Sequence, residues 1–182
     1  RGRKRHYTID MHCHVLTLAA EKLVENRPER QAMMEQQAKS MTPDSVAHTM
    51  VMLKDAFPKL TQLDARFKAM DEMGVDLQVM SPAPNQFNYW ADVDLARTLC
   101  RTINEHIADL VAQHPDRLLG MGSVALQHPE LCIEQLDYCV KHLGLKGVEI
   151  SSLVGGAEIA DPRFARFWAR CEELGCVVFL HP

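Results

Sequence analysis

Short apolar runs alternate with longer stretches of helical periodicity along the chain. Five runs have the length and flanking turn residues of strands buried on both faces, and they cover residues 8–15, 77–81, 117–124, 147–151 and 176–181. Apolar positions recur at helical spacing over 63–73, 92–113, 129–143 and 161–174. This order, one strand followed by four helix–strand units, predicts parallel strands joined by right-handed crossovers.

Two architectures fit this order of elements: an open doubly wound sheet and a (βα)8 barrel. No Gly-rich phosphate loop follows the first strand, which disfavours a dinucleotide-binding sheet. A complete barrel needs about 250 residues. We therefore predict an α/β fold of the TIM-barrel type, of which residues 8–182 supply about the first five strands.

Two segments stand apart from the alternation. Residues 1–7 contain a basic cluster, and we expect them to form a disordered N-terminal arm. Residues 19–58 are rich in Met and Gln, and we expect a long loop insertion that is helical in part. Within it, Thr42 and Pro43 have the sequence of a helix start, with Thr42 as the N-cap.

Composition and charge narrow the class of protein. Of the 182 residues, 47% are hydrophobic and 24% charged, as in a soluble globular protein, and the net charge of -4 gives no electrostatic reason to expect a nucleic acid. No apolar run approaches the roughly 18 residues that span a bilayer. The six cysteines form no CxxC pair. We expect a cytoplasmic protein with reduced cysteines and no membrane partner.

The segment Ile9–His14 carries the strongest chemical signal. Because side chains alternate along a strand, His12 and His14 should point to one side and Cys13 to the other. In a barrel, both imidazoles would face the interior near the carboxyl-terminal rim, where active sites lie. Two imidazoles at this spacing can bind one zinc-like ion, which needs at least one further ligand. A chance pair on a surface strand is the alternative.

His181 is the candidate for the third ligand. It ends the apolar run 177–180, again at the carboxyl end of a predicted strand. A hydrogen-bonded core histidine is the alternative interpretation. Four other histidines lie at helix edges or inside helices, and we expect them to be structural or solvated: His106, His114, His128 and His142. His48 lies in the insertion and could reach the site, but no feature of the sequence singles it out.

Six segments in the same order resemble the amidohydrolase-related (amidohydrolase 2) family, and among its members the amino-carboxymuconate-semialdehyde decarboxylase-like metal-dependent enzymes. The resemblance covers about residues 8–182. The segments are IDMHCH (9–14), MDEMGVDLQVMS (70–81), FNYW (87–90), PDRLLGMGSVALQHPE (115–130), HLGLKGVEI (142–150) and ELGCVVFLHP (173–182).

The resemblance implies a barrel with one divalent metal ion, expected to be zinc, held by His12, His14 and His181. A fourth ligand, an aspartate, and a proton-transfer histidine would lie beyond Pro182, so no catalytic residue is assigned within the chain. Binuclear relatives carry a modified lysine at the carboxyl end of the fourth strand. Residues 149–152 (EISS) occupy that place here, which favours a single metal.

The resemblance also implies substrate-binding residues. It maps a substrate-lining stretch onto Phe87, Tyr89 and Trp90, for which aromatic packing under the barrel rim is the alternative. It places a carboxylate-binding arginine at about Lys54. Lysine supplies a point charge in place of the bidentate guanidinium, a departure that affects which acid is bound.

The function that follows is a metal-dependent decarboxylase (carboxy-lyase) acting on a small unsaturated or aromatic carboxylic acid. A metal-dependent hydrolase with the same ligands is one alternative. A non-catalytic half-barrel fragment is another. The resemblance also allows a homodimer.

Overall fold

Five parallel strands form the centre of the molecule. The computed structural model describes residues 6–39 and 41–181, and the strands are β1 (Ile9–Val15), β2 (Leu77–Pro82), β3 (Leu118–Gly120), β4 (Gly147–Ser151) and β7 (Val177–His181). β1 pairs with β2, β2 with β3, and β4 with β7, all in parallel. A parallel bridge between Gly122 and Val148 joins the two groups. The spatial order of the strands therefore follows the chain.

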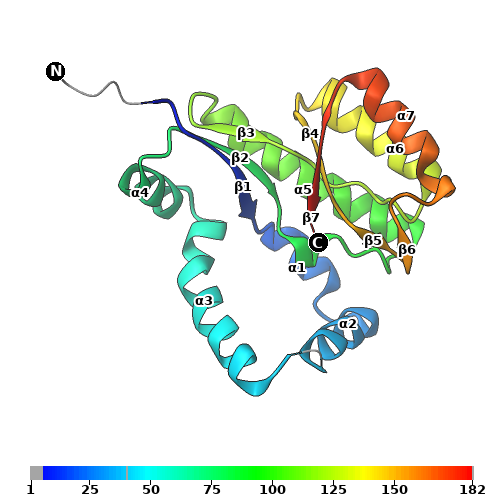
Figure 1. Cartoon of the computed structure of the whole chain (residues 1–182), viewed down its shortest axis with the longest axis horizontal. Helices are drawn as coiled ribbons and strands as arrows, with labels where there is room; N and C mark the ends of the chain where they lie inside the picture. The colour runs from blue at the N-terminus through cyan, green and yellow to red at the C-terminus, as the bar shows by residue number, and fades with distance from the viewer. Residues whose placement is uncertain (1–5, 40, 182) are drawn as a thin grey trace.

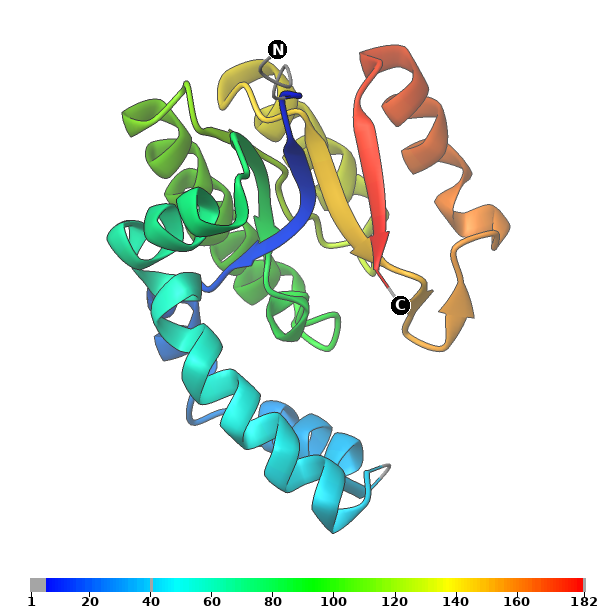
Figure 2. The ribbon, with the colours of Figure 1, turned by 60° about the vertical axis from the view of Figure 1, so that its left-hand side comes forward.

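This sequential order decides between the two predicted architectures. In a doubly wound sheet the strand order reverses at a switch point, and helices cover both faces. Here each strand lies beside its predecessor, and the helices that follow β2, β3 and β4 lie on one side of the strands (Figures 1 and 2). That is the arrangement of a (βα)8 barrel, as predicted.

Four helices connect these strands: α4 (Leu63–Met73), α5 (Val93–Gln113), α6 (Pro129–Asp137) and α7 (Ala165–Leu174). The side chain of Asp92 caps α5 by accepting a hydrogen bond from the backbone N–H of Leu95. α4 and α7 end at Gly74 and Gly175, both in the left-handed conformation that glycine adopts without strain. These starts and stops agree with the sequence pattern.

β3 is shorter than the predicted run 117–124. After the bridge at Gly122, the backbone of Ser123 bonds to the buried side chain of Asn104: its N–H donates to Asn104 Oδ1 (2.7 Å), and its carbonyl accepts from Asn104 Nδ2 (2.9 Å). A side-chain amide thus replaces the neighbouring strand and ends the ladder. The predicted helix 129–143 also changes character, because α6 gives way to a π-helical turn, Tyr138–His142.

Residues 19–58 lie within three helices and their connections: α1 (Leu18–Val24), α2 (Pro28–Lys39) and α3 (Pro43–Thr61). Thr42 caps α3, since its hydroxyl oxygen accepts a hydrogen bond from the Ser45 N–H. α2 and α3 extend beyond the carboxyl ends of the strands (Figures 1 and 2), and α3 has no buried residue. In the predicted arm, residues 1–5 lie outside the described residues, while His6 and Tyr7 are exposed.

The remaining elements are short. A 3-10 turn η1 (Pro84–Gln86) follows β2, and β4 leads into the antiparallel pair β5 (Leu153–Val154) and β6 (Ala157–Glu158), which precedes a 3-10 turn η3 (Pro162–Phe164). All six cysteines are free, and five of them are buried. In the described part of the chain, no helix combines the length and the apolar character needed to cross a membrane.

Candidate metal centre

Three histidines from two strands meet inside the curve of the sheet. The ring centroids of His12 and His14 on β1 lie 4.8 Å apart, and those of His181 on β7 lie 5.2 and 5.1 Å from them. One ring nitrogen from each histidine lies within 4.8 Å of the other two. Nε2 of His12 is 3.0 Å from Nε2 of His14. Convergence of three imidazole nitrogens suits one divalent cation.

The alternation along β1 is as predicted. Cys13 points away from the two imidazoles, and its Sγ lies 3.2 Å from the carbonyl oxygen of Val79. Burial, with a smaller contribution from Asp10, raises the pKa of the Cys13 thiol to about 12. The thiol therefore stays protonated at neutral pH, and because it points away from the imidazoles it is not among the donors that could share one ion.

A hydrogen-bond network holds β1 at a β-bulge, where the register with β2 shifts between Asp10 and Cys13. The guanidinium of Arg66, from α4, donates to the carbonyl oxygen of His14 and to Oε1 of Gln78 (2.9 Å). Gln78 Nε2 donates to one oxygen of Asp10 (3.0 Å), and the other accepts from the His12 N–H (3.1 Å). Bulges commonly change the direction of side chains beside functional sites. Here residues of α4 and β2 hold β1 in place on both sides of the bulge.

The surroundings of His14 select its tautomer. Its Nδ1 lies 3.1 Å from the carbonyl oxygen of Pro82 and 3.3 Å from the Ser81 hydroxyl. Because a carbonyl oxygen only accepts, Nδ1 carries the hydrogen and Nε2 keeps its lone pair. Burial, and then the neighbouring His12 and His181, lower the pKa of His14 to about 4. The imidazole is therefore neutral at pH 7, the form that binds metals.

Glu149, at the centre of β4, lies behind His14. It has no exposed surface, and its Oε2 is 3.6 Å from His14 Nδ1. Burial raises the pKa of this carboxyl, against smaller opposing effects of the Ser81 hydroxyl and His181. In the sequence, Glu149 stands out only as part of the segment 149–152 in the place of the modified lysine. The signal that could have found it is a carboxylate inside an otherwise apolar strand.

The predicted substrate-lining aromatics lie in the loop after η1. The Tyr89 hydroxyl oxygen accepts a hydrogen bond from the Ser151 N–H (3.3 Å), and Ser151 pairs with His181 across β4 and β7. Phe87 stacks on Tyr89 with centroids 5.6 Å apart. Trp90 packs against the core, and its buried indole N–H has no acceptor among the described residues. The loop thus reaches the carboxyl end of β4, while contact with a substrate stays a prediction.

Lys54, the predicted carboxylate-binding residue, lies elsewhere. It is an exposed residue of α3 and lines an open groove together with Met50, Val51, Leu53 and Phe57. The groove includes none of the three histidines. The substrate role of Lys54 therefore stays a prediction.

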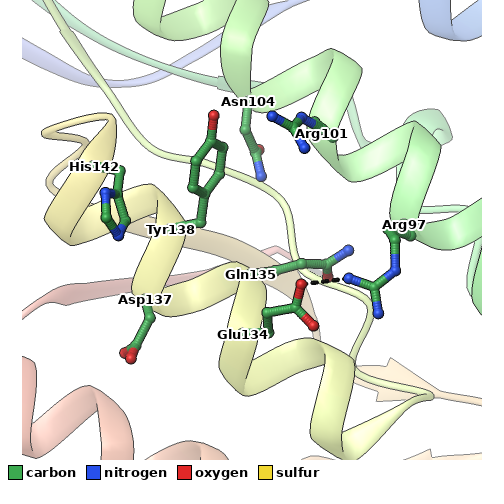
Figure 3. Close-up of a pocket in the computed structure, with 8 residues that line it drawn as sticks. All are labelled: Arg97, Arg101, Asn104, Glu134, Gln135, Asp137, Tyr138 and His142. Atoms are coloured by element: carbon green, nitrogen blue, oxygen red, sulfur yellow. Dashed lines mark hydrogen bonds and ion pairs between the residues drawn. The ribbon is translucent and has the colours of Figure 1, made fainter.

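A second hollow lies on the outer surface between α5 and α6. Figure 3 shows Arg97 directed at Glu134, with which it forms an ion pair. Arg101 pairs with Glu105, whose carboxylate also accepts a hydrogen bond from the Tyr138 hydroxyl (2.9 Å). These charges satisfy one another, and barrel active sites lie at the carboxyl ends of the strands. We assign no function to this hollow.

Successive parallel strands with clustered imidazoles near their carboxyl ends are the features of barrel proteins that bind a metal. A family model described as amidohydrolase matches residues 9–182. The chain therefore belongs to this amidohydrolase family, as its motifs predict.

Proteins of known activity resemble parts of the chain. It is 40% identical over 119 residues to a 2-amino-3-carboxymuconate-6-semialdehyde decarboxylase of Dictyostelium discoideum, with 65% of this chain and 33% of that protein covered. It is 30% identical over 125 residues to a gamma-resorcylate decarboxylase of Polaromonas sp., with 65% and 38% covered. The matched part of the chain thus spans about a third of the length of these relatives.

Solved structures support the fold independently. The chain superposes with a TM-score of 0.79 on a 5-carboxyvanillate decarboxylase of Novosphingobium aromaticivorans, at 23% sequence identity. The match covers 100% of this chain and 52% of that one, whose structure was determined with manganese and 4-hydroxy-3-methoxy-5-nitrobenzoic acid. The fold of the chain is therefore about half of such a barrel.

Proposed function

We propose that this chain supplies the metal-binding half of a metal-dependent decarboxylase, which removes CO2 from a small aromatic or unsaturated carboxylic acid. The observation that carries the proposal is the convergence of His12, His14 and His181 on one point inside the barrel. The two curated relatives described above are both named decarboxylases, and they support the type of reaction.

The three histidines would hold one divalent cation, each through one ring nitrogen. When bound, the cation supplies a Lewis acid that polarises a substrate oxygen. The residues of this chain keep His14 neutral, hold it as the Nδ1–H tautomer and fix the geometry of β1. We expect the fourth ligand and the proton-transfer group beyond Pro182. Zinc suits three imidazoles, and the manganese in the related structure makes the identity of the cation part of the test.

The substrate would approach the carboxyl ends of the strands. Phe87 and Trp90 belong to the loop that reaches Ser151 at this end, and they would line the ring or the unsaturated chain of the acid. Support for Lys54 as a contact to the carboxylate is limited to its position on α3, which extends beyond the same end of the barrel (Figure 1). Free, mostly buried cysteines support a reducing compartment such as the cytoplasm.

Metal content tests the proposal directly. After loading with Zn²⁺ or Mn²⁺ and dialysis, elemental analysis should find about one ion per native chain and none in His12→Ala. Met11→Ala is the matched control, because the exposed Met11 neighbours His12 on β1 and is no ligand. It should retain the ion. A native chain that retains neither metal would contradict the proposal and favour the non-catalytic half-barrel.

The hydrolase alternative differs in its product. The same three imidazoles would also hold a cation that activates water for hydrolysis of a carbonyl or C–N bond. The complete protein, loaded with metal, should release CO2 from dihydroxybenzoates or carboxyvanillate and lose this activity in His12→Ala. Release of an amine or an acid from amides and esters, without CO2 from the aromatic acids, would favour the hydrolase.

A further inference from the structure

Glu149 is the only buried acidic residue in the described part of the chain. Among the described residues, no hydrogen bond of ordinary geometry reaches either carboxylate oxygen, although the Ser81 hydroxyl and the His14 ring lie near them. Burial of a carboxylate without such hydrogen bonds is energetically unfavourable. Its neighbours Val148 and Ile150 are buried in the apolar core on the other side of the strand, so Glu149 is the one of the three that faces β1. The folding of β4 therefore does not account for a carboxylate at this position.

The position of Glu149 connects it to one metal-ligand candidate. Its backbone N–H donates to the Gly122 carbonyl (2.9 Å), and the residue pairs with Phe179 of β7. The side chain reaches β1 across the inside of the sheet, where Oε2 lies 3.6 Å from Nδ1 of His14. It approaches the opposite side of the ring from Nε2, the nitrogen that faces His12.

Direct binding of a metal by Glu149 does not fit this geometry. The group of donors close enough to share one ion contains His12, His14 and His181, and it does not include Glu149. The carboxylate faces the nitrogen of His14 that carries the hydrogen. In metalloproteins, a carboxylate at this place fixes the orientation of the ligand ring and raises its basicity.

We propose that Glu149 is a positioning residue that holds the His14 imidazole for metal binding. The inference rests on the metal centre proposed above. Pro82 supplies the closer acceptor for Nδ1–H, at 3.1 Å, and Glu149 adds a negatively polarised acceptor behind the ring. At 3.6 Å the attraction is electrostatic more than a hydrogen bond, but it acts in a buried environment of low dielectric, where such attraction is strong.

Metal affinity and apo stability together test this role. Competition with a chromophoric chelator for Zn²⁺ should show about 10- to 100-fold weaker binding in Glu149→Leu than in the native chain. Glu149→Gln keeps an acceptor oxygen, so its loss should be smaller. The metal-free Glu149→Leu chain should be as stable to urea as the native chain or more stable, because a buried carboxyl without a hydrogen bond has been removed.

The opposite directions of these two effects separate positioning from a structural role. A structural carboxylate would give parallel losses of apo stability and metal affinity, and that result would overturn the inference. Glu158→Gln is the control, since Glu158 is an exposed carboxylate of β6, and its affinity should be unchanged. If Glu149→Leu does not fold, as judged by circular dichroism, Glu149→Gln carries the test, with weaker binding expected and unchanged binding overturning the role.

The outcome also distinguishes the two proposals. Native affinity that is retained in a folded Glu149→Leu overturns the role of Glu149 and leaves the metal centre standing. A native chain that binds neither Zn²⁺ nor Mn²⁺ overturns both.

Discussion

At the scale of single residues, Arg66 holds the strand that carries His12 and His14, although it is not itself a ligand candidate. Its buried guanidinium bonds to the His14 carbonyl and, through Gln78, to Asp10. A planar guanidinium donates in several fixed directions, so one side chain can hold a carbonyl oxygen of β1 and an amide of β2 at once. The orientation of His12 and His14 thus depends on a residue of α4.

We predict that Arg66→Lys lowers the free energy of unfolding by about 2–4 kcal/mol, because an ammonium cannot replace both bonds and leaves buried acceptors unpaired. Urea unfolding of the metal-free chain measures the effect. Lys68→Met on the same helix is the control, since that side chain is 78% exposed, and it should change the value by less than about 0.5 kcal/mol. Equal effects of the two substitutions would contradict the interpretation.

At the scale of elements, one ion-pair cluster joins α6 to α7. Asp137, the last residue of α6, accepts two hydrogen bonds from Arg170 of α7 (2.7 and 2.8 Å) and one from Lys141 (2.9 Å). These bonds, with that of Arg170 foremost, lower the pKa of the Asp137 carboxyl to about 2. The two helices that cover neighbouring strands are therefore linked by an interaction that depends on pH.

Asp137→Asn should make the chain about 1 kcal/mol less stable at pH 7, a value reduced for partial exposure of the pair. A carboxyl with a depressed pKa contributes fully above its ordinary value of 3.8, and the contribution is lost as the pH falls towards about 2. The difference from the native chain should therefore shrink between about pH 4 and pH 2.

Urea unfolding at pH 7, 5 and 3 would measure this difference. Asp116→Asn, at an exposed position of the α5–β3 connection, serves as the control and should show little effect at any of these values. A difference for Asp137→Asn that does not depend on pH would show that the carboxylate charge is not its cause.

At the scale of the whole molecule, the 182 residues leave apolar surface uncovered. α3 exposes Met50, Val51, Met52, Leu53 and Phe57, and among the described strands β1 and β7 each pair on one side only. Exposed apolar patches and open sheet edges favour association. The related 5-carboxyvanillate decarboxylase chain is about twice as long as these 182 residues.

We predict that the 182-residue chain self-associates, and that Val51→Glu weakens the association about tenfold by placing a charge on the α3 patch. Sedimentation velocity over a range of concentrations would show it. Met73→Glu is the matched control, because Met73 is 64% exposed and Val51 62%, and Met73 lies on α4 outside the patch. A chain that is monomeric throughout, or equal effects of the two charges, would contradict this.

The sequence by itself determined the features that depend on local geometry. Two-residue alternation along β1 predicts that His12 and His14 share one side of the strand. Capping at Thr42 and the left-handed ends at Gly74 and Gly175 follow from side-chain and backbone chemistry within a few residues. The sequence also showed that His181 ends an apolar run and that the chain resembles the amidohydrolase family.

Tertiary structure alone decided how these local features meet. The sequential strand order brings His181 to His14, and it depends on pairing between segments far apart in the chain. Asn104 ends β3 early because its side chain reaches the backbone of Ser123 from α5. The contact between Glu149 and His14 also depends on tertiary structure. Alternation along β4 predicts only that Glu149 faces one side of the strand, and the curvature of the sheet brings His14 to that side.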